Sequence, residues 1–453
     1  MKKLERRAII CLALAFVLLA GICYYVFLVW TEGGKWISLP SNQHIYKGGY
    51  LSTGSIYDRN GTLLVKNGSK GKKIYNSDRE VRRSTLHVVG DRRGNIRTGA
   101  NVFFADKMVG YNFFNGTYST NNKGRKMHLT IDSDISKAAL DALGDRNGTV
   151  GVCNYKTGAI LCMVSTPTFD PNNPPTIGKN DTSGTYINKL ISYRTVPGST
   201  FKLVTAAAAI EKLDYENFSY QCRGREQYGK AKVDTIKCVG VHGHVNFAQA
   251  LAKSCNVAFG RISMDLGGKT LKEYTKKAGL LSPYYINGIK TTPGTCDFPG
   301  GTINLAWTGI GQYHDMINPF AMMMYVGAIG GGGTTAEPHL IKRLDTSGGL
   351  PATLDKSADK KTLLNKNTAK VLADMMRNNV QSNYGQGNFP NLEIYAKSGT
   401  AEVGGGKKPH AWFVGFVKNK PYAFVVLALT AGAARVHVGQ LAHRRARVGL
   451  QSL

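Results

Sequence analysis

Residues 196–210 read VPGSTFKLVTAAAAI and place a Pro-Gly turn directly before an alanine-rich segment. Alanine is the strongest helix former and Pro-Gly marks a turn, so the stretch predicts a turn that opens a helix. Ser199 stands at the junction, and Lys202 follows three residues later on the same face of the expected helix. The pair is either an ordinary helix start with a nearby lysine, or a nucleophile with its base one turn away.

The Ser-x-x-Lys pattern alone does not decide between these interpretations, because it also occurs at Ser69–Lys72 and Ser357–Lys360 in Lys-rich stretches. Two later segments favour the catalytic interpretation. AKSCNVAFG (252–260) contains Ser254-Cys255-Asn256, and YAKSGTAEV (395–403) contains Lys397-Ser398-Gly399-Thr400.

The composition narrows the class of protein. The chain has 453 residues, of which 42% are hydrophobic, so we expect two domains with packed cores. Its 58 basic and 29 acidic residues give a formal charge of +29. Such a charge suggests a protein that binds nucleic acid. The N-terminal segment instead favours a membrane protein whose basic surface faces solvent or anionic polymers. We therefore expect no nucleic-acid partner.

An uncharged segment near the N-terminus predicts one transmembrane helix. Ala8–Trp30 contains 23 residues without a charge, enough to cross a bilayer as a helix. Lys2, Lys3, Arg6 and Arg7 precede it, so the positive-inside rule places residues 1–7 in the cytoplasm. A cleaved signal peptide is the competing interpretation, but the apolar run is too long and no small-residue cleavage site follows. The sequence thus predicts a single-pass membrane protein with its remaining residues outside the cytoplasm.

The rest of the chain divides near residue 148 into two expected domains of mixed α/β structure. In the first, at 31–147, LSTGSIYDRNGTLLV (51–65) predicts a strand, a turn and a strand, and 125–143 predicts a strand followed by a helix. Residues 111–126 are expected to form a loop.

In the second expected domain, at 148–429, TVGVCNYKTGAILCMVS (149–165) predicts a hairpin. Three strand-like runs at 392–403, 410–417 and 422–429 have short connections, which predicts an antiparallel meander. We expect one sheet with a helix-rich middle segment packed on it.

The three short motifs, in this order, resemble those of the bacterial penicillin-binding enzymes: Ser-x-x-Lys, Ser-x-Asn and Lys-Ser-Gly. Further blocks are similar to class B penicillin-binding proteins of the short-pedestal type: GSIYDRNG (54–61), TIDSDISKAALDAL (130–143) and HGHVNFAQALAKSCN (242–256). The resemblance covers roughly residues 50–430. It implies a serine β-lactamase-like transpeptidase domain at 148–429, an antiparallel sheet with helices. It also implies a small pedestal domain at 31–147 and the transmembrane anchor at 8–30.

The resemblance implies a peptidoglycan D,D-transpeptidase that forms an acyl-enzyme on D-Ala-D-Ala through Ser199 and reacts covalently with β-lactams. Lys202 would be the base, for which its pKa must fall from about 10.4 to about 7. Ser254 would relay a proton to the departing D-Ala nitrogen. Asn256 would hold Lys202 and the substrate amide.

The same resemblance assigns substrate binding to the last motif. Lys397, Ser398 and Thr400 would bind the terminal carboxylate, with one positive charge and two hydroxyl donors. Gly399 would let a peptide lie close to this strand. The backbone N–H groups of Ser199 and Thr400 would form the oxyanion hole.

The cysteines outside the apolar segment suggest a disulfide. Cys222 and Cys238 flank a polar stretch and are predicted to pair in an oxidising compartment. Cys238, His242 and His244 also suggest zinc, but their spacing fits no standard pattern, so we expect no metal and no cofactor.

The expected partners are peptidoglycan stem peptides, the lipid-linked precursor, β-lactams and, by resemblance, a membrane glycosyltransferase of the wall machinery. The motifs indicate a role in cell wall organisation and leave cell division, cell shape and sporulation open. A β-lactamase or D-Ala carboxypeptidase on the same fold, and a non-catalytic scaffold, are the alternatives.

The C-terminal segment departs from the rest of the chain in composition. Residues 341–420 contain 11 Lys and 2 Arg, whereas residues 430–453 contain 4 Arg and no Lys. This shift suggests that the tail at 430–453 results from a frameshift, a truncated gene or a sequence assembly error, and it keeps the scaffold interpretation open.

Overall fold

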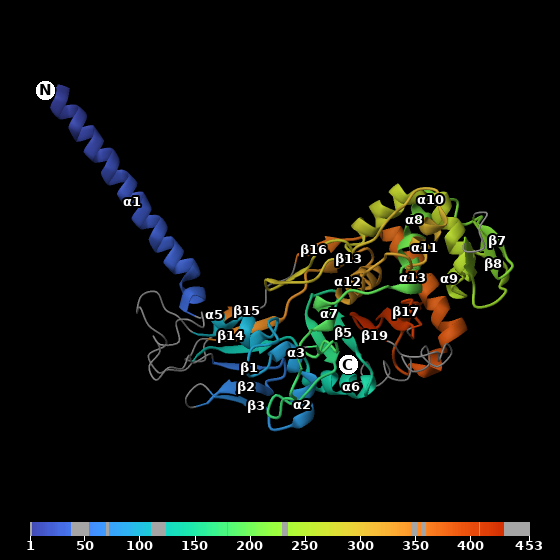
Figure 1. Ribbon diagram of the computed structural model, residues 1–453, viewed down its shortest axis with the longest axis horizontal. Helices are drawn as coiled ribbons and strands as arrows, with labels where there is room; N and C mark the ends of the chain where they lie inside the picture. The colour runs from blue at the N-terminus through green and yellow to red at the C-terminus, as the bar shows by residue number, and fades with distance from the viewer. Residues whose placement is uncertain are drawn as a thin grey trace.

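The computed structural model describes residues 2–37, 54–68, 72–109, 124–178, 180–228, 234–345, 351–354, 359–406 and 408–429. One long helix stands away from a body in which a smaller sheet lies between that helix and a larger α/β unit (Figure 1). Residues 111–123 of the expected loop and the tail at 430–453 lie outside the described residues. The suggested origin of this tail therefore stays a prediction.

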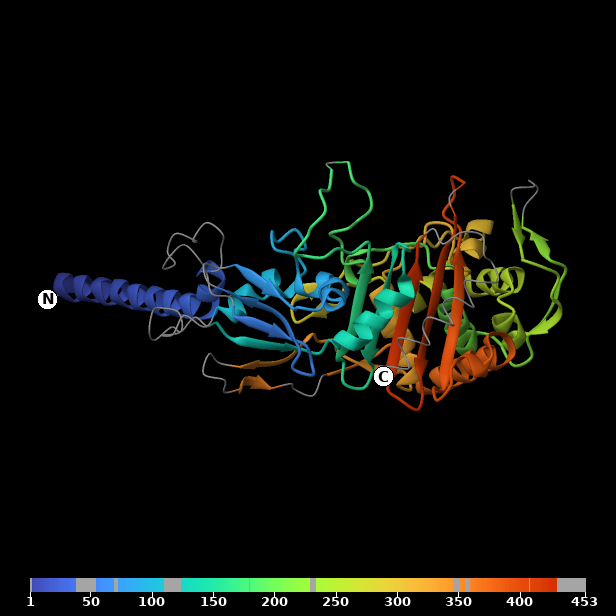
Figure 2. The same ribbon diagram turned by 90° about the horizontal axis from the view of Figure 1, so that it is seen from below.

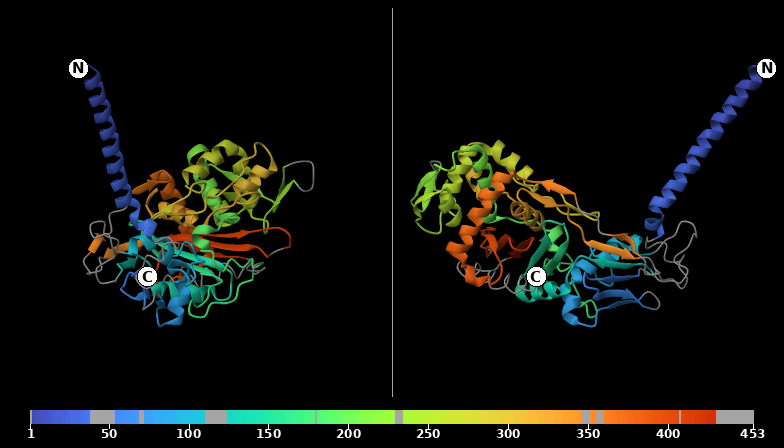
Figure 3. Two further views of the ribbon diagram at one scale, coloured as in Figure 1. Left: turned by 60° about the vertical axis from the view of Figure 1, so that its left-hand side comes forward. Right: turned by 180° about the vertical axis from the view of Figure 1, so that it is seen from behind.

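The N-terminal helix α1, Lys2–Ile37, is long and apolar enough between Lys2 and Gly33 to cross a membrane. Its large apolar side chains are exposed and pack against no other part of the described chain over most of its length (Figure 3). The helix includes the segment predicted at 8–30 and continues beyond it at both ends.

The smaller sheet, called the pedestal sheet below, contains six strands in the order β15-β14-β4-β1-β2-β3. Four come from the N-terminal part: β1 Ser55–Tyr57, β2 Leu63–Asn67, β3 Lys73–Tyr75 and β4 Lys126–Leu129. Strands β1 and β2 pair antiparallel, which confirms the predicted strand–turn–strand, and β1 pairs parallel with β4. Four short helices accompany the sheet: α2 Arg79–Ser84, α3 Leu86–Val89, α4 Ala100–Phe103 and α5 Ala105–Met108.

Two strands of this sheet come from far along the chain. Strands β14, Ile341–Asp345, and β15, Pro351–Leu354, extend it beyond β4. In Figure 1 they are the orange strands beside the blue and cyan ones. A segment that the sequence places in the second domain thus completes the sheet of the first.

The larger unit is built on a five-stranded antiparallel sheet, β17-β18-β19-β5-β6. Strands β5, Gly148–Asn154, and β6, Ile160–Thr166, confirm the predicted hairpin. Strands β17 Ile394–Ala401, β18 His410–Val417 and β19 Tyr422–Ala428 confirm the predicted meander. Strand β17 lies at the edge of the sheet, so one of its sides is available to another chain.

Helices cover both faces of this sheet. Helix α6, Ser133–Leu143, packs on β5 and β6 and contributes to the smaller of the two hydrophobic cores along the sheet. On the opposite face the central helix α12, Pro319–Gly330, contacts β5, β18 and β19, and every one of its residues is buried. Around α12 lie four further helices: α8 Lys202–Lys212, α10 Asn256–Lys277, α11 Ile303–Gly309 and α13 Lys366–Asn379.

Two small ribbons lie at the end of the body farthest from α1 (Figure 2). One pairs β7, Ser219–Cys222, with β10, Gly243–Asn246, and the other pairs β8, Arg225–Gln227, with β9, Thr235–Lys237. Helix α9, Phe247–Ala252, follows β10 and leads into α10. The remaining elements are α7 Lys189–Ser192, β11 Tyr285–Ile286, β12 Ile289–Lys290, β13 Thr334–Ala336, β16 Lys360–Thr362 and the short turns η3 Gly198–Thr200, η4 Val380–Tyr384 and η5 Gln386–Asn388.

A buried carboxylate, that of Asp58, joins the pedestal sheet to α6. Asp58 is fully buried, and one of its oxygens accepts hydrogen bonds from the backbone N–H groups of Asn60, 2.9 Å, and Thr62, 2.7 Å. The other oxygen accepts from the N–H group and the hydroxyl of Ser133, at 3.3 and 2.7 Å. A buried carboxylate needs such donors, and these donors in turn need the carboxylate.

Replacing Asp58 by Ala is therefore expected to destabilise the folded chain. The change leaves buried donors without an acceptor, which costs about 3 kcal/mol of unfolding free energy. Thermal unfolding of the full chain in detergent would measure the loss as a lower midpoint. The matched control is Asp134→Ala, because the Asp134 side chain is 73% exposed. Equal midpoints for the two variants would contradict the structural role of Asp58.

Candidate active site

Ser199 lies in the short turn η3, directly before α8. Two hydrogen bonds from other elements hold this turn. The indole Nε1 of Trp412, on β18, donates to the carbonyl oxygen of Val196 at 2.9 Å. The backbone N–H group of Gly198 donates to the carbonyl oxygen of Gly311 at 2.8 Å. The nucleophile expected from the sequence is thus fixed against both the sheet and the loop that follows α11.

Close contact between η3 and β17 requires glycine on both sides. A Cβ atom on Gly399 would lie 2.9 Å from the carbonyl oxygen of Pro197 and 2.9 Å from Cγ2 of Thr200. Gly198 has a φ of +54°, and a Cβ atom there would lie 2.4 Å from the carbonyl oxygen of Thr400. The sequence suggested that Gly399 makes room for a substrate peptide. The structure adds a second reason, because glycine at this position lets the turn that carries Ser199 approach the strand. The predicted room for a substrate peptide stays a prediction.

Lys202 is fully buried, and its ammonium group contacts the second motif. Its Nζ donates to Asn256 Oδ1 at 2.7 Å, to the Ser254 carbonyl oxygen at 2.7 Å and to Ser254 Oγ at 3.3 Å. The expectation that Asn256 holds Lys202 is confirmed. Ser199 Oγ makes no hydrogen bond to Lys202 or to any other described residue in this structure.

The second motif reaches Lys202 through an unusual backbone conformation. Ser254 has a φ of +52°, and Asn256 is the first residue of α10. A left-handed serine costs about 1–3 kcal/mol and is found mainly where function requires it. The conformation turns Ser254 and Asn256 toward Lys202, whereas Cys255 is buried among other cysteines.

Lys397, on β17, reaches the same serine. Its Nζ donates to Ser254 Oγ at 3.1 Å and to the carbonyl oxygen of Ser398 at 2.8 Å, and the residue is 1% exposed. The hydroxyl of Ser254 therefore accepts hydrogen bonds from two lysines, and its own hydrogen is left to donate elsewhere.

Burial of both ammonium groups determines their protonation. Removal from water lowers the pKa of Lys202 to about 7. Burial, and then the positive charge of Lys202, lower the pKa of Lys397 well below its ordinary value. Near neutral pH a substantial fraction of Lys202 is thus neutral and able to accept a proton.

Two residues that no sequence pattern indicated position the last motif. The hydroxyl of Tyr384 accepts hydrogen bonds from the Asn379 amide, 2.9 Å, and from the Ser398 N–H group, 2.8 Å, and donates to Ser398 Oγ at 2.8 Å. The Ser398 hydroxyl therefore keeps its own hydrogen for a ligand. Thr400, two residues along the strand, is exposed. The roles predicted for these side chains, and for the backbone N–H groups of Ser199 and Thr400, stay predictions.

The predicted disulfide is not formed in the structure. Cys222 and Cys238 are free thiols whose Sγ atoms lie 3.9 Å apart, whereas a disulfide requires about 2.05 Å. Cys238 Sγ lies equally near a third sulfur, Sγ of Cys255, at 3.7 Å. No sequence pattern indicated that this third cysteine lies beside the other two.

Known proteins match the chain at the level of both sequence and fold. Residues 148–444 match the sequence model of the penicillin binding protein transpeptidase domain. The chain is 28% identical over 345 residues to the peptidoglycan D,D-transpeptidase PbpA of Mycobacterium tuberculosis, an alignment covering 69% of each chain. It is 27% identical over 300 residues to the stage V sporulation protein D of Bacillus subtilis, covering 63% of this chain and 45% of that protein.

Among solved structures, the fold resembles the ceftriaxone acyl-enzyme complex of penicillin-binding protein A from M. tuberculosis, with a TM-score of 0.75. That similarity has 23% sequence identity and covers 88% of this chain and 98% of the other.

The contact between Gly399 and the nucleophile turn can be tested by Gly399→Ala. The added methyl group meets the Pro197 carbonyl oxygen and should displace Ser199, lowering its rate of acylation by a fluorescent penicillin at least about tenfold. Gly387→Ala is the matched control, because a Cβ atom at Gly387 meets nothing within 4 Å. If Gly399→Ala reacted as fast as the control, the close approach would not matter for reactivity.

Proposed function

Because the chain belongs to the penicillin-binding protein transpeptidase family, we propose that it is a serine D,D-transpeptidase that cross-links peptidoglycan stem peptides. The observation that carries the proposal is the pair of buried lysines, Lys202 and Lys397, that both donate to the Ser254 hydroxyl beside the Ser199 turn. This arrangement supplies a weakly basic amine, a proton relay and a cationic group around one serine.

In the proposed first step, Ser199 Oγ attacks the carbonyl carbon between the two D-Ala residues of a stem peptide. Neutral Lys202 accepts the hydroxyl proton as the new ester bond forms. The backbone N–H groups of Ser199 and Thr400 would donate to the developing oxyanion, each contributing roughly 3 kcal/mol. The packing of η3 on β17 supports this role, because it holds the two residues on adjacent elements.

Ser254 would then protonate the leaving group. Its hydroxyl already accepts from both lysines, so its hydrogen is free to pass to the D-Ala nitrogen as the C–N bond breaks. The proton that Lys202 took from Ser199 replaces it. Free D-Ala leaves, and the stem peptide remains as an ester on Ser199 until an amine of a neighbouring stem peptide attacks.

Lys397, Ser398 and Thr400 would bind the terminal carboxylate. An incoming carboxylate favours the charged form of Lys397 and so offsets the effect of burial on its pKa. The Ser398 hydroxyl, which Tyr384 holds, has its own hydrogen available for the carboxylate. A β-lactam presents the same groups and would acylate Ser199.

The proposal includes a location at the bacterial cell membrane. Helix α1 would anchor the chain with residues 1–7 in the cytoplasm, and the body would lie outside the cytoplasm. There the pedestal at 31–147, completed by β14 and β15, would carry the transpeptidase unit at 148–429. Its substrates would be stem peptides and the lipid-linked precursor, and by resemblance it would act beside a membrane glycosyltransferase.

The test is covalent labelling of the full chain in detergent with a fluorescent penicillin. We expect wild type to be labelled and Ser199→Ala to be unlabelled. Ser382→Ala, which changes an exposed serine whose hydroxyl donates to the Asn378 carbonyl, should be labelled like wild type. A folded wild-type chain without label, or a labelled Ser199→Ala variant, would contradict the proposal.

A second assay separates transpeptidation from hydrolysis. A peptide ending in D-Ala-D-Ala is incubated with the chain and a fluorescent D-amino acid as acceptor. A transpeptidase exchanges the terminal D-Ala for the fluorescent residue. Release of D-Ala without exchange would instead identify a carboxypeptidase.

A further inference from the structure

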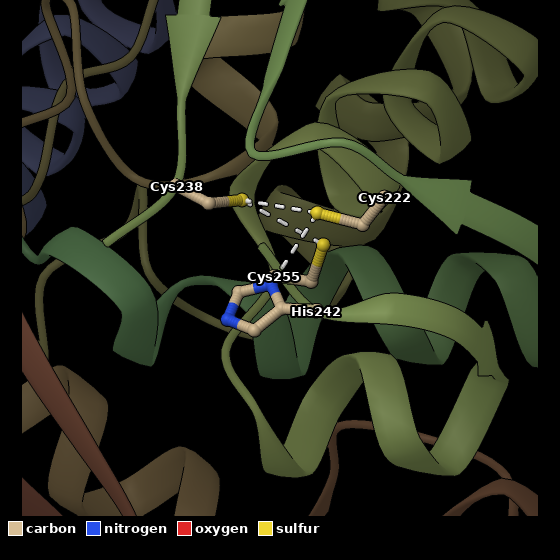
Figure 4. Close-up of side chains that lie close together, drawn as sticks. All are labelled: Cys222, Cys238, His242 and Cys255. Carbon is tan, nitrogen blue, oxygen red and sulfur yellow. Dashed lines mark hydrogen bonds between the residues drawn. The ribbon is translucent and has the colours of Figure 1, made fainter. Parts of the chain in front are cut away.

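Four side chains that the proposed reaction does not use converge behind the second motif: Cys222, Cys238, His242 and Cys255 (Figure 4). Their ligand atoms, three sulfurs and one imidazole nitrogen, all lie within 4.8 Å of one another. They come from four separate segments. Cys222 ends β7, Cys238 follows β9, His242 precedes β10 and Cys255 is the residue before α10.

Three of the six distances between these atoms match those of a tetrahedral metal site, and the others are at most 4.8 Å. Zinc bonds of about 2.3 Å to sulfur and about 2.0 Å to nitrogen, at tetrahedral angles, separate two sulfurs by about 3.8 Å and sulfur from nitrogen by about 3.5 Å. The Sγ atoms of Cys222 and Cys238 are 3.9 Å apart, and those of Cys238 and Cys255 are 3.7 Å apart. Cys222 Sγ lies 3.5 Å from His242 Nδ1.

We propose that Cys222, Cys238, His242 and Cys255 bind one Zn²⁺ ion as a structural Cys₃His site. The three thiols lose their protons on binding and the imidazole stays neutral, so the complex carries one net negative charge. Three thiolates and one imidazole in tetrahedral array form a donor set that zinc prefers. Four protein ligands fill the coordination sphere, which is typical of structural rather than catalytic zinc.

A disulfide explains the cluster less well than a metal does. A bond between Cys222 and Cys238 would require the sulfurs to approach from 3.9 Å and would leave Cys255 beside them as an unpaired thiol. A metal ion would engage all four side chains, whose ligand atoms already lie within 4.8 Å of one another. Cys222 and Cys255 are fully buried, and the Gly224 N–H group already donates to Cys222 Sγ at 3.4 Å, a contact that stabilises a thiolate.

The four proposed ligands differ from the three residues that suggested zinc in the sequence. Cys238 and His242 suggested zinc only together with His244, and the spacing of these three residues fits no standard zinc pattern. In the structure His244 is exposed, and its Nε2 lies 2.6 Å from the Ser219 hydroxyl, outside the cluster.

The site connects the terminal ribbons to the catalytic motif. Cys255 is the central residue of Ser254-Cys255-Asn256, and Asn256 Nδ2 donates to the carbonyl oxygen of Lys237, the neighbour of Cys238, at 2.8 Å. A metal at this position would fix the residue between the two groups that hold Lys202. The ion acts as a positioning element, because its ligands hold the motif without touching the reacting atoms.

Metal content of the full chain, purified in detergent under reducing conditions, tests the site directly. We expect mass spectrometry to find one Zn²⁺ per wild-type chain and X-ray absorption to find three sulfurs and one nitrogen around it. Cys238→Ser and His242→Ala should lose most of the metal. His244→Ala and Cys296→Ser, which change the same residue types outside the cluster, should keep it.

The wild-type spectrum keeps the test decisive if the ligand variants fail to fold. A wild-type chain that holds no stoichiometric zinc, or zinc with other ligands, would overturn the proposal. So would a Cys222–Cys238 disulfide as the main form of chain isolated from its native membrane without reductant. None of these results depends on transpeptidase activity.

The positioning role rests on the proposed function and has its own readout. Removing zinc with a chelator should lower the rate of Ser199 acylation at least about tenfold, and added Zn²⁺ should restore it. The same treatment of His244→Ala should give the same loss and recovery. Metal-free chain that is acylated at the original rate would overturn the positioning role while leaving both the metal site and the proposed transpeptidase intact.

Discussion

Two buried ammonium groups converge on one serine hydroxyl, and the arrangement of the larger unit follows from that constraint. Lys202 and Lys397 both donate to Ser254 Oγ, and neither is exposed to water. Two charged ammonium groups in such a place repel each other and lack solvation, so burial favours loss of a proton. The resulting neutral amine is what a serine nucleophile needs near neutral pH. Packing of the surrounding helices and sheet offsets the unfavourable free energy of burying the two lysines.

Three elements must meet to bring Lys202 and Lys397 to Ser254, and each has a local feature that allows the contact. Helix α8 begins at Lys202, directly after the Ser199 turn. Strand β17 lies against that turn because Gly198 and Gly399 carry no Cβ atoms. The segment before α10 presents Ser254 through a left-handed backbone conformation. The proposed zinc site would fix the third element through Cys255, so that one metal-ligand cluster supports the chemistry from outside the reaction.

Much of this was predictable from the sequence. The alternation and short turns of β5, β6, β17, β18 and β19 gave the hairpin and meander, and the three ordered motifs identified the residues around Lys202. Contacts between distant segments were not predictable. No local pattern indicates that β14 and β15 complete the pedestal sheet, that Tyr384 holds Ser398, or that Cys222 and Cys255 lie beside His242. The contact of Gly399 with Pro197 and Thr200 was not predictable either, because these residues lie far earlier in the chain.

The proposed activation of Ser199 by a buried, neutral Lys202 should be visible in the pH dependence of the acylation rate. The rate for a β-lactam, measured on the full chain between about pH 5 and about pH 10, should rise with pH through an inflection near 7 and then level off. Below that inflection Lys202 is protonated and cannot accept the serine proton. The inflection should persist in His244→Ala, which removes an exposed imidazole that contacts Ser219 and not Lys202. A rate that stays low until about pH 10, the range of an ordinary lysine, would contradict the account.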